Sequence, residues 1–287
     1  MLQAAAMELL PQPPMSRDNV RSLRVDNVAA GAPLPFGLTP TALEDTAPDA
    51  WGERVIRRAH AKLRQEDRNT AALDPVDFVM WVDDEARVGA LRLFDPRAGV
   101  YLRASGPHRH VPPLVELDKV LQAARALEDG TESARDLRYL LGQGTSLGGA
   151  RPKSTARDSD GRLAVGKFPS QADRRDVIRG EVLAMQLAAR AGIRVAPARV
   201  EVIGGTAIAV IRRFDRTDDG GRIPYVSAAT MLQSDGRDAT HAYTELVDVL
   251  LQTGADPIAD IHELWRRLVF NFLICNTDDH LRNTGFL

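Results

Sequence analysis

The first half of the chain combines predicted helices with shorter apolar runs. Residues 51–66 and 115–127 repeat apolar side chains every three or four positions, which is the spacing of an amphipathic helix. The apolar runs 76–81 and 88–94 lie between them and predict either a hairpin or one helix and one strand. Residues 1–50 are rich in Pro and Ala, so we expect a loosely ordered arm there.

The second half carries a denser pattern. A glycine-rich turn at 142–153 precedes an apolar strand at 163–168 and a helix at 176–191, which Gly192 ends. A strand pair and two helices are predicted after it, over 195–203 with 207–213 and over 242–252 with 258–275. Cys275 closes the last apolar run and is expected to pack as a small hydrophobe.

Composition excludes several classes of protein. The 287 residues are 44% hydrophobic and 26% charged, which is ordinary for a folded globular protein. A formal net charge of −2 gives no general electrostatic basis for binding nucleic acid or an anionic membrane. One cysteine excludes an internal disulfide framework, and neither a membrane-spanning apolar run nor a secretion signal is evident. We therefore expect a cytoplasmic protein without direct contact to nucleic acid or membrane.

The basic residues are unevenly divided between arginine and lysine. Of the 37 basic residues, only Lys62, Lys119, Lys153 and Lys167 are lysines. In a chain that prefers arginine, a retained lysine indicates a position that needs a compact ammonium group. Lys62 and Lys119 lie on polar faces of predicted helices, so Lys153 and Lys167 are the candidates for function.

The order of five sequence features matches the parts of a phosphoryl-transfer site. Such a site needs backbone N–H groups near the phosphates, a lysine that binds them, a glutamate that orients the lysine, and a later aspartate and asparagine. Here the glycine-rich turn is followed by Lys167 on a strand and Glu181 on a helix. Asp278 and Asn283 come much later and are separated by four residues. Each feature alone is weak, and their order carries the prediction.

Other interpretations of the same residues stay open. The glycine-rich segment is not a Walker A loop, because Pro152 stands where a glycine would precede the lysine. Asp278, Asp279 and His280 form a candidate metal cluster, although no second ligand pair has suitable spacing. Glycine-rich turns, strand lysines and helix glutamates are also common without any function. Nothing positions the partners that a Ser-His-Asp or Cys-His hydrolase requires.

From about residue 44 onward, the chain resembles the HipA family of kinase toxins from bacterial toxin–antitoxin modules. The segments that carry the resemblance, in family order, are 47–52, 145–153, 167–169, 213–216 and 276–287. The resemblance implies an α+β, protein-kinase-like fold with two lobes, use of ATP with Mg²⁺, and phosphorylation of serine or threonine in a protein substrate. It also implies neutralisation by a small DNA-binding antitoxin of the HipB type. Some members phosphorylate the glutamyl-tRNA synthetase, which makes that enzyme a candidate substrate.

The resemblance also implies roles for individual residues. Asp278 is the expected catalytic base, Asn283 the expected Mg²⁺ ligand, and Ser146 the serine that the family autophosphorylates to inactivate itself. Phosphorylation of Ser146 would add about −1.5 to −2 charge beside a loop that binds ATP, and would so eject the loop. The implied ATP-binding residues are Gly148, Gly149, Ala150, Arg151, Pro152, Lys153, Lys167, Glu181, Arg212, Arg213, Phe214, His280 and Asn283.

Three departures from the family pattern bear on function, the first being that the amino-terminal β-subdomain of the family is not evident in the sequence. The second metal-binding aspartate of the family lies beyond the catalytic loop, and the sequence stops at Leu287 before reaching it. We therefore expect an incomplete carboxy-terminal helical lobe, whose last helices expose apolar faces. Arg212 stands in the expected adenine hinge, where the family often has an acidic residue.

The amino-terminal arm resembles a different family. Residues 15–28 and 36–44 are similar to the tail of a short-chain-dehydrogenase-like NAD(P)-binding protein, without its dinucleotide-binding motif. The expected organisation is a fused foreign arm at 1–46, an amino-terminal HipA-like subdomain at 47–136 and an incomplete kinase domain at 137–287.

Three functions are consistent with these observations. The first is an ATP-dependent serine/threonine protein kinase of HipA type. The second is an inactive truncated kinase remnant that binds ATP or an antitoxin without catalysis, because the second metal-binding aspartate is missing. The third assigns the function to residues 1–50, which would dock to a membrane-associated dehydrogenase.

Overall fold

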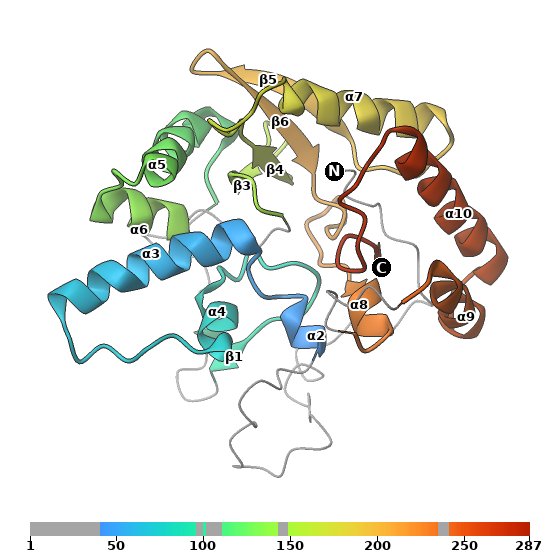
Figure 1. Cartoon of the computed structure of the whole chain (residues 1–287), viewed down its shortest axis with the longest axis horizontal. Coiled ribbons are helices and arrows are strands. Elements are labelled where there is room, and N and C mark those ends of the chain that lie inside the picture. The colour runs from blue at the N-terminus through green and yellow to red at the C-terminus, as the bar shows by residue number, and fades with distance from the viewer. Residues whose placement is uncertain (1–40, 96–99, 102–110, 143–148, 235–240) are drawn as a thin grey trace, which may run out of the picture.

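A four-stranded antiparallel sheet lies at the centre of the structure, a computed structural model that describes residues 41–95, 100–101, 111–142, 149–234 and 241–287 (Figure 1). The strands, in spatial order, are β3 (Lys153–Arg157), β4 (Leu163–Lys167), β6 (Thr206–Arg212) and β5 (Ala198–Ile203). A two-residue turn of Gly204 and Gly205 joins β5 to β6. Its φ angles of 55° and 76° explain the two glycines, because other residues rarely adopt positive φ.

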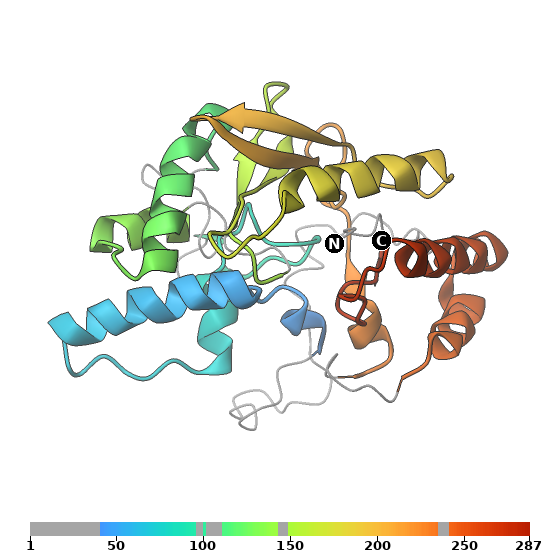
Figure 2. The ribbon, with the colours of Figure 1, turned by 45° about the horizontal axis from the view of Figure 1, so that its top comes forward.

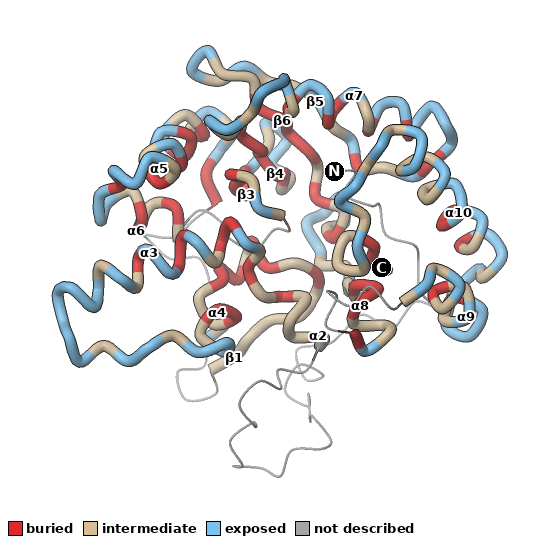
Figure 3. The backbone as a smooth tube through the Cα atoms, viewed as in Figure 1, coloured by how far each residue is buried: buried red, intermediate tan, exposed pale blue. Residues whose placement is uncertain are grey.

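Helices cover both faces of this sheet (Figures 1 and 2). Helix α7 (Val177–Arg190) packs its apolar side against β5 and β6. A second core brings β3, β6 and Phe168, the residue directly after β4, together with three other helices, α3 (Ala50–Glu66), α5 (Leu117–Asp129) and α6 (Ala134–Gly142). Successive side chains of a strand point to opposite faces of the sheet, which explains why the two faces have separate cores. Ile208 of β6 belongs to the core with α3 and α5, whereas its neighbour Ala209 contacts α7. Figure 3 shows the buried positions along β4 and β6.

The carboxy-terminal part builds a separate, smaller apolar core. Its fully buried members include Leu246, Leu250, Leu264 and Phe286. The elements that supply this core are β7 (Val226–Ser227), α8 (Ala228–Met231), α9 (Tyr243–Thr253), α10 (Pro257–Leu273) and β8 (Gly285–Phe286). Strand β8 pairs with β7, so the end of the chain folds back beside the beginning of this unit.

The ambiguous apolar runs in the first half have different structures. The run 76–81 is the helix α4 (Pro75–Trp81), which Asp74 caps by accepting hydrogen bonds from Val76 N and Asp77 N. The run 88–94 supplies only Phe94 to the two-residue strand β1 (Phe94–Asp95), which pairs with β2 (Val100–Tyr101). The short helix α2 (Thr41–Glu44) opens the described chain, and the 3₁₀ turn η1 (Leu114–Glu116) precedes α5. The other predicted helices and strands are present, with ends shifted by a few residues.

The last helix exposes apolar side chains, which confirms the expectation from the sequence. Trp265, Phe272 and Leu273 of α10 have exposed fractions of 63%, 83% and 71%. The prediction that Cys275 packs as a small hydrophobe is wrong, because its φ of 55° ends the helical path and its side chain is exposed. Within the part of the chain that the structure describes, none of the helices is both long and apolar enough for a membrane crossing.

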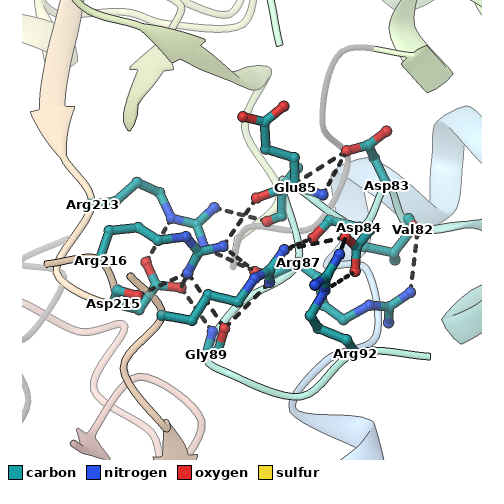
Figure 4. Close-up of polar contacts among 12 residues, drawn as sticks. Val82, Asp83, Asp84, Glu85, Arg87, Gly89, Arg92, Arg213, Asp215 and Arg216 are labelled. Carbon is teal, nitrogen blue, oxygen red and sulfur yellow. Dashed lines mark hydrogen bonds and ion pairs between the residues drawn. The ribbon is translucent and has the colours of Figure 1, made fainter. Parts of the chain in front are cut away.

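A buried ionic cluster ties the segment after β6 to the loop after α4 (Figure 4). The buried carboxylate of Asp215 accepts hydrogen bonds from Arg213 Nε at 2.7 Å, Arg216 Nη1 at 2.8 Å and Gly89 N at 2.7 Å. The two arginines also donate to the carbonyl oxygens of Glu85, Ala86 and Arg87. Burial opposes the charged form of Asp215, but the arginines outweigh it and lower the pKa of Asp215 to about 2.

We predict that Asp215→Ala lowers the free energy of unfolding by about 3–5 kcal/mol, because it leaves two buried arginines without their carboxylate. A depressed carboxyl pKa stabilises the fold above its unfolded value of about 4 and loses this effect as the pH falls towards 2. Urea unfolding should therefore show a difference between wild type and variant that shrinks in acid. Asp219→Ala, in the exposed part of the same loop, is the control and should leave the midpoint nearly unchanged.

Candidate active site

Two buried lysines face each other at one end of the sheet. Lys153 begins β3, Lys167 ends β4, and the antiparallel register places them directly opposite one another. Each has only 4% of its surface exposed. Because like charges at opposite strand positions repel, each ammonium group needs a negative partner of its own.

Glu181 of α7 is the partner of Lys167. The Lys167 Nζ atom lies 2.5 Å from Glu181 Oε1, and both side chains are buried. Asp176 caps α7 by accepting from Arg179 N, which sets the start of the helix and so the position of Glu181 one turn later. The expected pairing of these two residues is therefore present.

Asp49 is the partner of Lys153, and sequence reasoning did not assign it to the site. The Asp49 carboxylate binds Lys153 Nζ, which also donates to Gly149 O at 2.8 Å. Burial raises the pKa of Asp49 to about 6, although the neighbouring ammonium of Lys153 favours the charged form. Asp49 lies in the segment 47–52 that resembles the HipA family, and that resemblance was the one sign in the sequence that pointed to it.

The predicted catalytic loop connects α10 to β8 and is held by its own hydrogen bonds. Asn283 Nδ2 donates to Asp278 O at 2.7 Å, and Asn283 N donates to His280 O at 2.7 Å. The Asp278 carboxylate is about half exposed, with His280 Nε2 at 3.4 Å from its Oδ1 atom. The backbone N–H of Asp278 also donates a hydrogen bond to Asn276 Oδ1, at 3.3 Å.

A cavity of about 470 Å³ brings these separate parts together. Its wall includes Lys153, Lys167, Glu181 and, from the loop after α10, Asp278. The remaining lining residues come from the glycine-rich segment and the loop before α7: Gly149, Ala150, Arg151, Ala172, Asp173, Arg174, Arg175 and Val177. Among these described lining residues five are basic and three acidic, so the cavity favours an anionic ligand.

Arg151 connects two walls of the cavity. Its guanidinium binds the Asp173 carboxylate at 2.6 Å, and Asp173 also accepts from Ser170 N at 3.0 Å. These hydrogen bonds lower the pKa of Asp173, which keeps it charged. Arg174 and Arg175 are exposed beside them.

The residues predicted for the adenine hinge do not line this cavity. Arg212 binds Asp160 at 2.8 Å on the surface, and Arg213 belongs to the buried cluster with Asp215. The ring of Phe214 packs against Tyr225, with 5.4 Å between the ring centroids.

Other predicted site residues lie near the cavity or outside the described residues. Pro152 is buried, and its carbonyl accepts from Phe168 N at 3.0 Å. Asn283 borders a smaller pocket of about 30 Å³ that also contacts Asp278. Ser146 and Gly148 lie outside the residues that the structure describes.

Comparisons with known proteins identify the family that the second half of the chain matches. The family profile described as "HipA-like C-terminal domain" matches residues 145–287. A Sinorhizobium fredii protein named "Putative kinase Y4mE" is 25% identical over 169 residues, covering 50% of this chain and 38% of that protein.

A solved structure supports the fold. A chain from the Shewanella oneidensis MR-1 toxin–antitoxin complex of HipA, HipB and operator DNA aligns with a TM-score of 0.57 and 17% identity. The alignment covers 86% of this chain and 59% of that one, so this chain spans less than two thirds of either relative. The fold is thus α+β and similar to that of HipA. Residues 145–287 are thus a HipA-like C-terminal domain, and the chain is similar to HipA in fold.

Proposed function

We propose that the chain is an ATP-dependent protein kinase of HipA type, which uses Mg²⁺ and phosphorylates serine or threonine. One observation carries this proposal: the Lys167–Glu181 ion pair and the Asp278 carboxylate border the same cavity. A lysine held by a helix glutamate, facing an aspartate from a later loop, is the arrangement that phosphoryl transfer needs. The cavity volume and its excess of basic residues suit a nucleoside triphosphate.

Each of these residues has a defined task in such a reaction. The terminal phosphoryl group of ATP passes to a substrate hydroxyl. The hydroxyl oxygen bonds to the γ-phosphorus, the bond from that phosphorus to the oxygen bridging it to the β-phosphate breaks, ADP leaves, and the hydroxyl loses its proton. Asp278, half exposed at the cavity wall, accepts that proton and orients the hydroxyl. Lys153 and Lys167 hold the phosphate oxygens and stabilise the negative charge that develops on them.

Asn283 suits Mg²⁺ by the chemistry of its side chain. Its amide nitrogen is already bound to Asp278 O, which leaves the amide oxygen, a ligand type that Mg²⁺ accepts. A bound Mg²⁺ would supply positive charge that neutralises the phosphates. The amide oxygen of Asn283 would thus hold the ion in the catalytic loop, in the smaller pocket that Asp278 also borders.

The finer parts of this proposal come from the family. We infer that a small HipB-like antitoxin restrains the kinase, that phosphorylation of Ser146 inactivates it, and that it acts in the cytoplasm. The presence of HipB in the solved Shewanella oneidensis complex supports an antitoxin partner. The glutamyl-tRNA synthetase is the first substrate to test.

A second candidate function is an inactive remnant that binds ATP or an antitoxin without catalysis. Among the described residues, no group of three or more His, Cys, Asp or Glu side chains is arranged to hold a metal ion. The two candidates separate experimentally, because ATP binding without phosphate transfer would favour the remnant.

We predict that Asp278→Asn lowers kcat for phosphate transfer by about 10²–10⁴-fold, because the amide cannot accept the substrate proton. The affinity for ATP·Mg²⁺ should stay nearly unchanged, since the two lysines are intact. Transfer of radiolabelled phosphate to the chain itself or to the glutamyl-tRNA synthetase measures the first quantity, and calorimetry measures the second. Asp248→Asn, on the exposed side of α9, is the matched control. Undiminished transfer by Asp278→Asn would remove the role assigned to this residue.

We also predict that Lys167→Met weakens ATP binding about 10- to 100-fold, the loss expected for charge-assisted hydrogen bonds of about 1.5–3 kcal/mol. The substitution removes the ammonium group but keeps a side chain of similar length. Lys119→Met is the control, because Lys119 is exposed and its ammonium group lies 3.5 Å from the Glu116 carboxylate, away from the lining of the cavity. Equal nucleotide affinity in the two variants would contradict a phosphate-binding role for Lys167.

A further inference from the structure

A short acidic segment, residues 44–49, contacts both walls of the candidate active site, and we name it the acidic strap. Glu44 binds Arg282 at 3.0 Å, next to Asn283 in the catalytic loop. Asp45 accepts from Ser227 N at 2.8 Å, in the strand that pairs with β8. Asp49 binds Lys153 in β3. Three carboxylates within six residues thus connect the loop that carries Asp278 to the strand that carries Lys153.

The position of Asp49 is fixed by more than the lysine. Its Oδ1 atom caps α3 by accepting from Gly52 N at 2.6 Å, while its Oδ2 atom binds Lys153. The N-terminus of α3 favours a negative charge at this place. Trp51 N also donates to Gly149 O, at 3.4 Å, so the same helix start contacts the glycine-rich segment. The backbone of Asp49 is therefore fixed at the start of α3, and its carboxylate binds Lys153 from there.

Lys153 depends on this partner because its surroundings oppose its charge. It is buried, Lys167 faces it across the strand pair, and the carboxylate of Glu181 is bound to Lys167. Burial lowers the pKa of Lys153, while the Asp49 carboxylate acts in the opposite direction and Lys167 adds to the lowering. Among the charged groups around Lys153, Asp49 makes the largest contribution in favour of the ammonium form.

We propose that Asp49 is a positioning residue of the nucleotide site, which keeps the Lys153 ammonium charged and oriented for the phosphates. This role rests on the proposed kinase function. Asp49 does not itself have to touch the nucleotide, because it acts through Lys153. Without the Asp49 carboxylate, Lys153 would take up a proton only when an anionic ligand binds. The affinity for that ligand would therefore weaken as the pH rises.

Asp49→Asn separates this role from the helix cap, because asparagine caps helices as well as aspartate but carries no charge. Asp49→Ser is the second variant should the first fold poorly. Asp74→Asn is the matched control, because Asp74 caps α4 in the same way but is exposed and away from any lysine contact. All three variants are made in the full chain.

The four lysines of this chain allow a direct measurement without nucleotide. In protein labelled with ¹³C at the lysine ε-carbons, NMR titration gives four signals, and Lys153→Arg identifies that of Lys153. We expect the Lys153 midpoint to fall by about one pH unit or more in Asp49→Asn, a tenfold weaker proton affinity. Asp74→Asn should leave the Lys153 midpoint unchanged. An unchanged Lys153 midpoint in Asp49→Asn would overturn the proposal.

Calorimetry with ATP·Mg²⁺ over the same pH range completes the test. The affinity of Asp49→Asn should fall relative to wild type by about tenfold once the pH exceeds the lowered Lys153 midpoint, and recover below it. Parallel pH profiles for the two proteins would contradict the positioning role even if the midpoint moves. If the wild-type chain binds no ATP, the proposed function is what fails, because the lysine titration still decides whether Asp49 controls Lys153.

Discussion

Two buried ammonium groups at opposite positions of one strand pair are the constraint on which the candidate site depends. Lys153 and Lys167 lie where little water reaches them and where their charges repel. The fold provides a separate carboxylate for each lysine, Glu181 from α7 and Asp49 from the start of α3. The packing of α3 and α7 therefore also places a negative charge beside each of the two buried lysines. A displacement of either helix would leave one buried charge without a partner.

Stability alone does not explain these ion pairs. A buried pair contributes little net stability compared with apolar residues of similar size, because the cost of desolvation offsets the attraction. The Asp215 cluster shows a structural use of buried charge, since its arginines satisfy backbone carbonyl groups away from the cavity. The lysine pairs differ in that both border a cavity large enough for a ligand. An anionic ligand in this cavity, as the proposed kinase function requires, would explain their placement.

The sequence predicts the parts of the site that lie in segments with a clear pattern. Lys167 ends an apolar strand, Glu181 lies on an amphipathic helix, and Asp278 and Asn283 have a recognisable spacing, so their roles could be inferred before their positions were known. Strand β3 has no such pattern, because its residues are Lys-Ser-Thr-Ala-Arg and yet four of the five are buried. The contact between Asp49 and Lys153 spans 104 residues and arises only when α3 packs beside β3. Local patterns in a single sequence contain no record of such a contact.

The two largest apolar cores of the described chain explain why polar contacts matter for the geometry of the site. The larger core draws on residues between Trp51 and Ile208, the smaller one on residues between Ala228 and Phe286, and their buried members do not overlap. The lysines belong to the first unit, whereas Asp278 follows α10 of the second. The acidic strap joins the two units through ion pairs and hydrogen bonds. Close-packed cores resist gradual deformation, whereas a few polar contacts can re-form in a shifted geometry. Arg194, which follows α7, also joins the two units through Asp260 and Glu263 of α10. The separation between the two lysines and Asp278 is therefore set by polar contacts between the units and not by one shared apolar core.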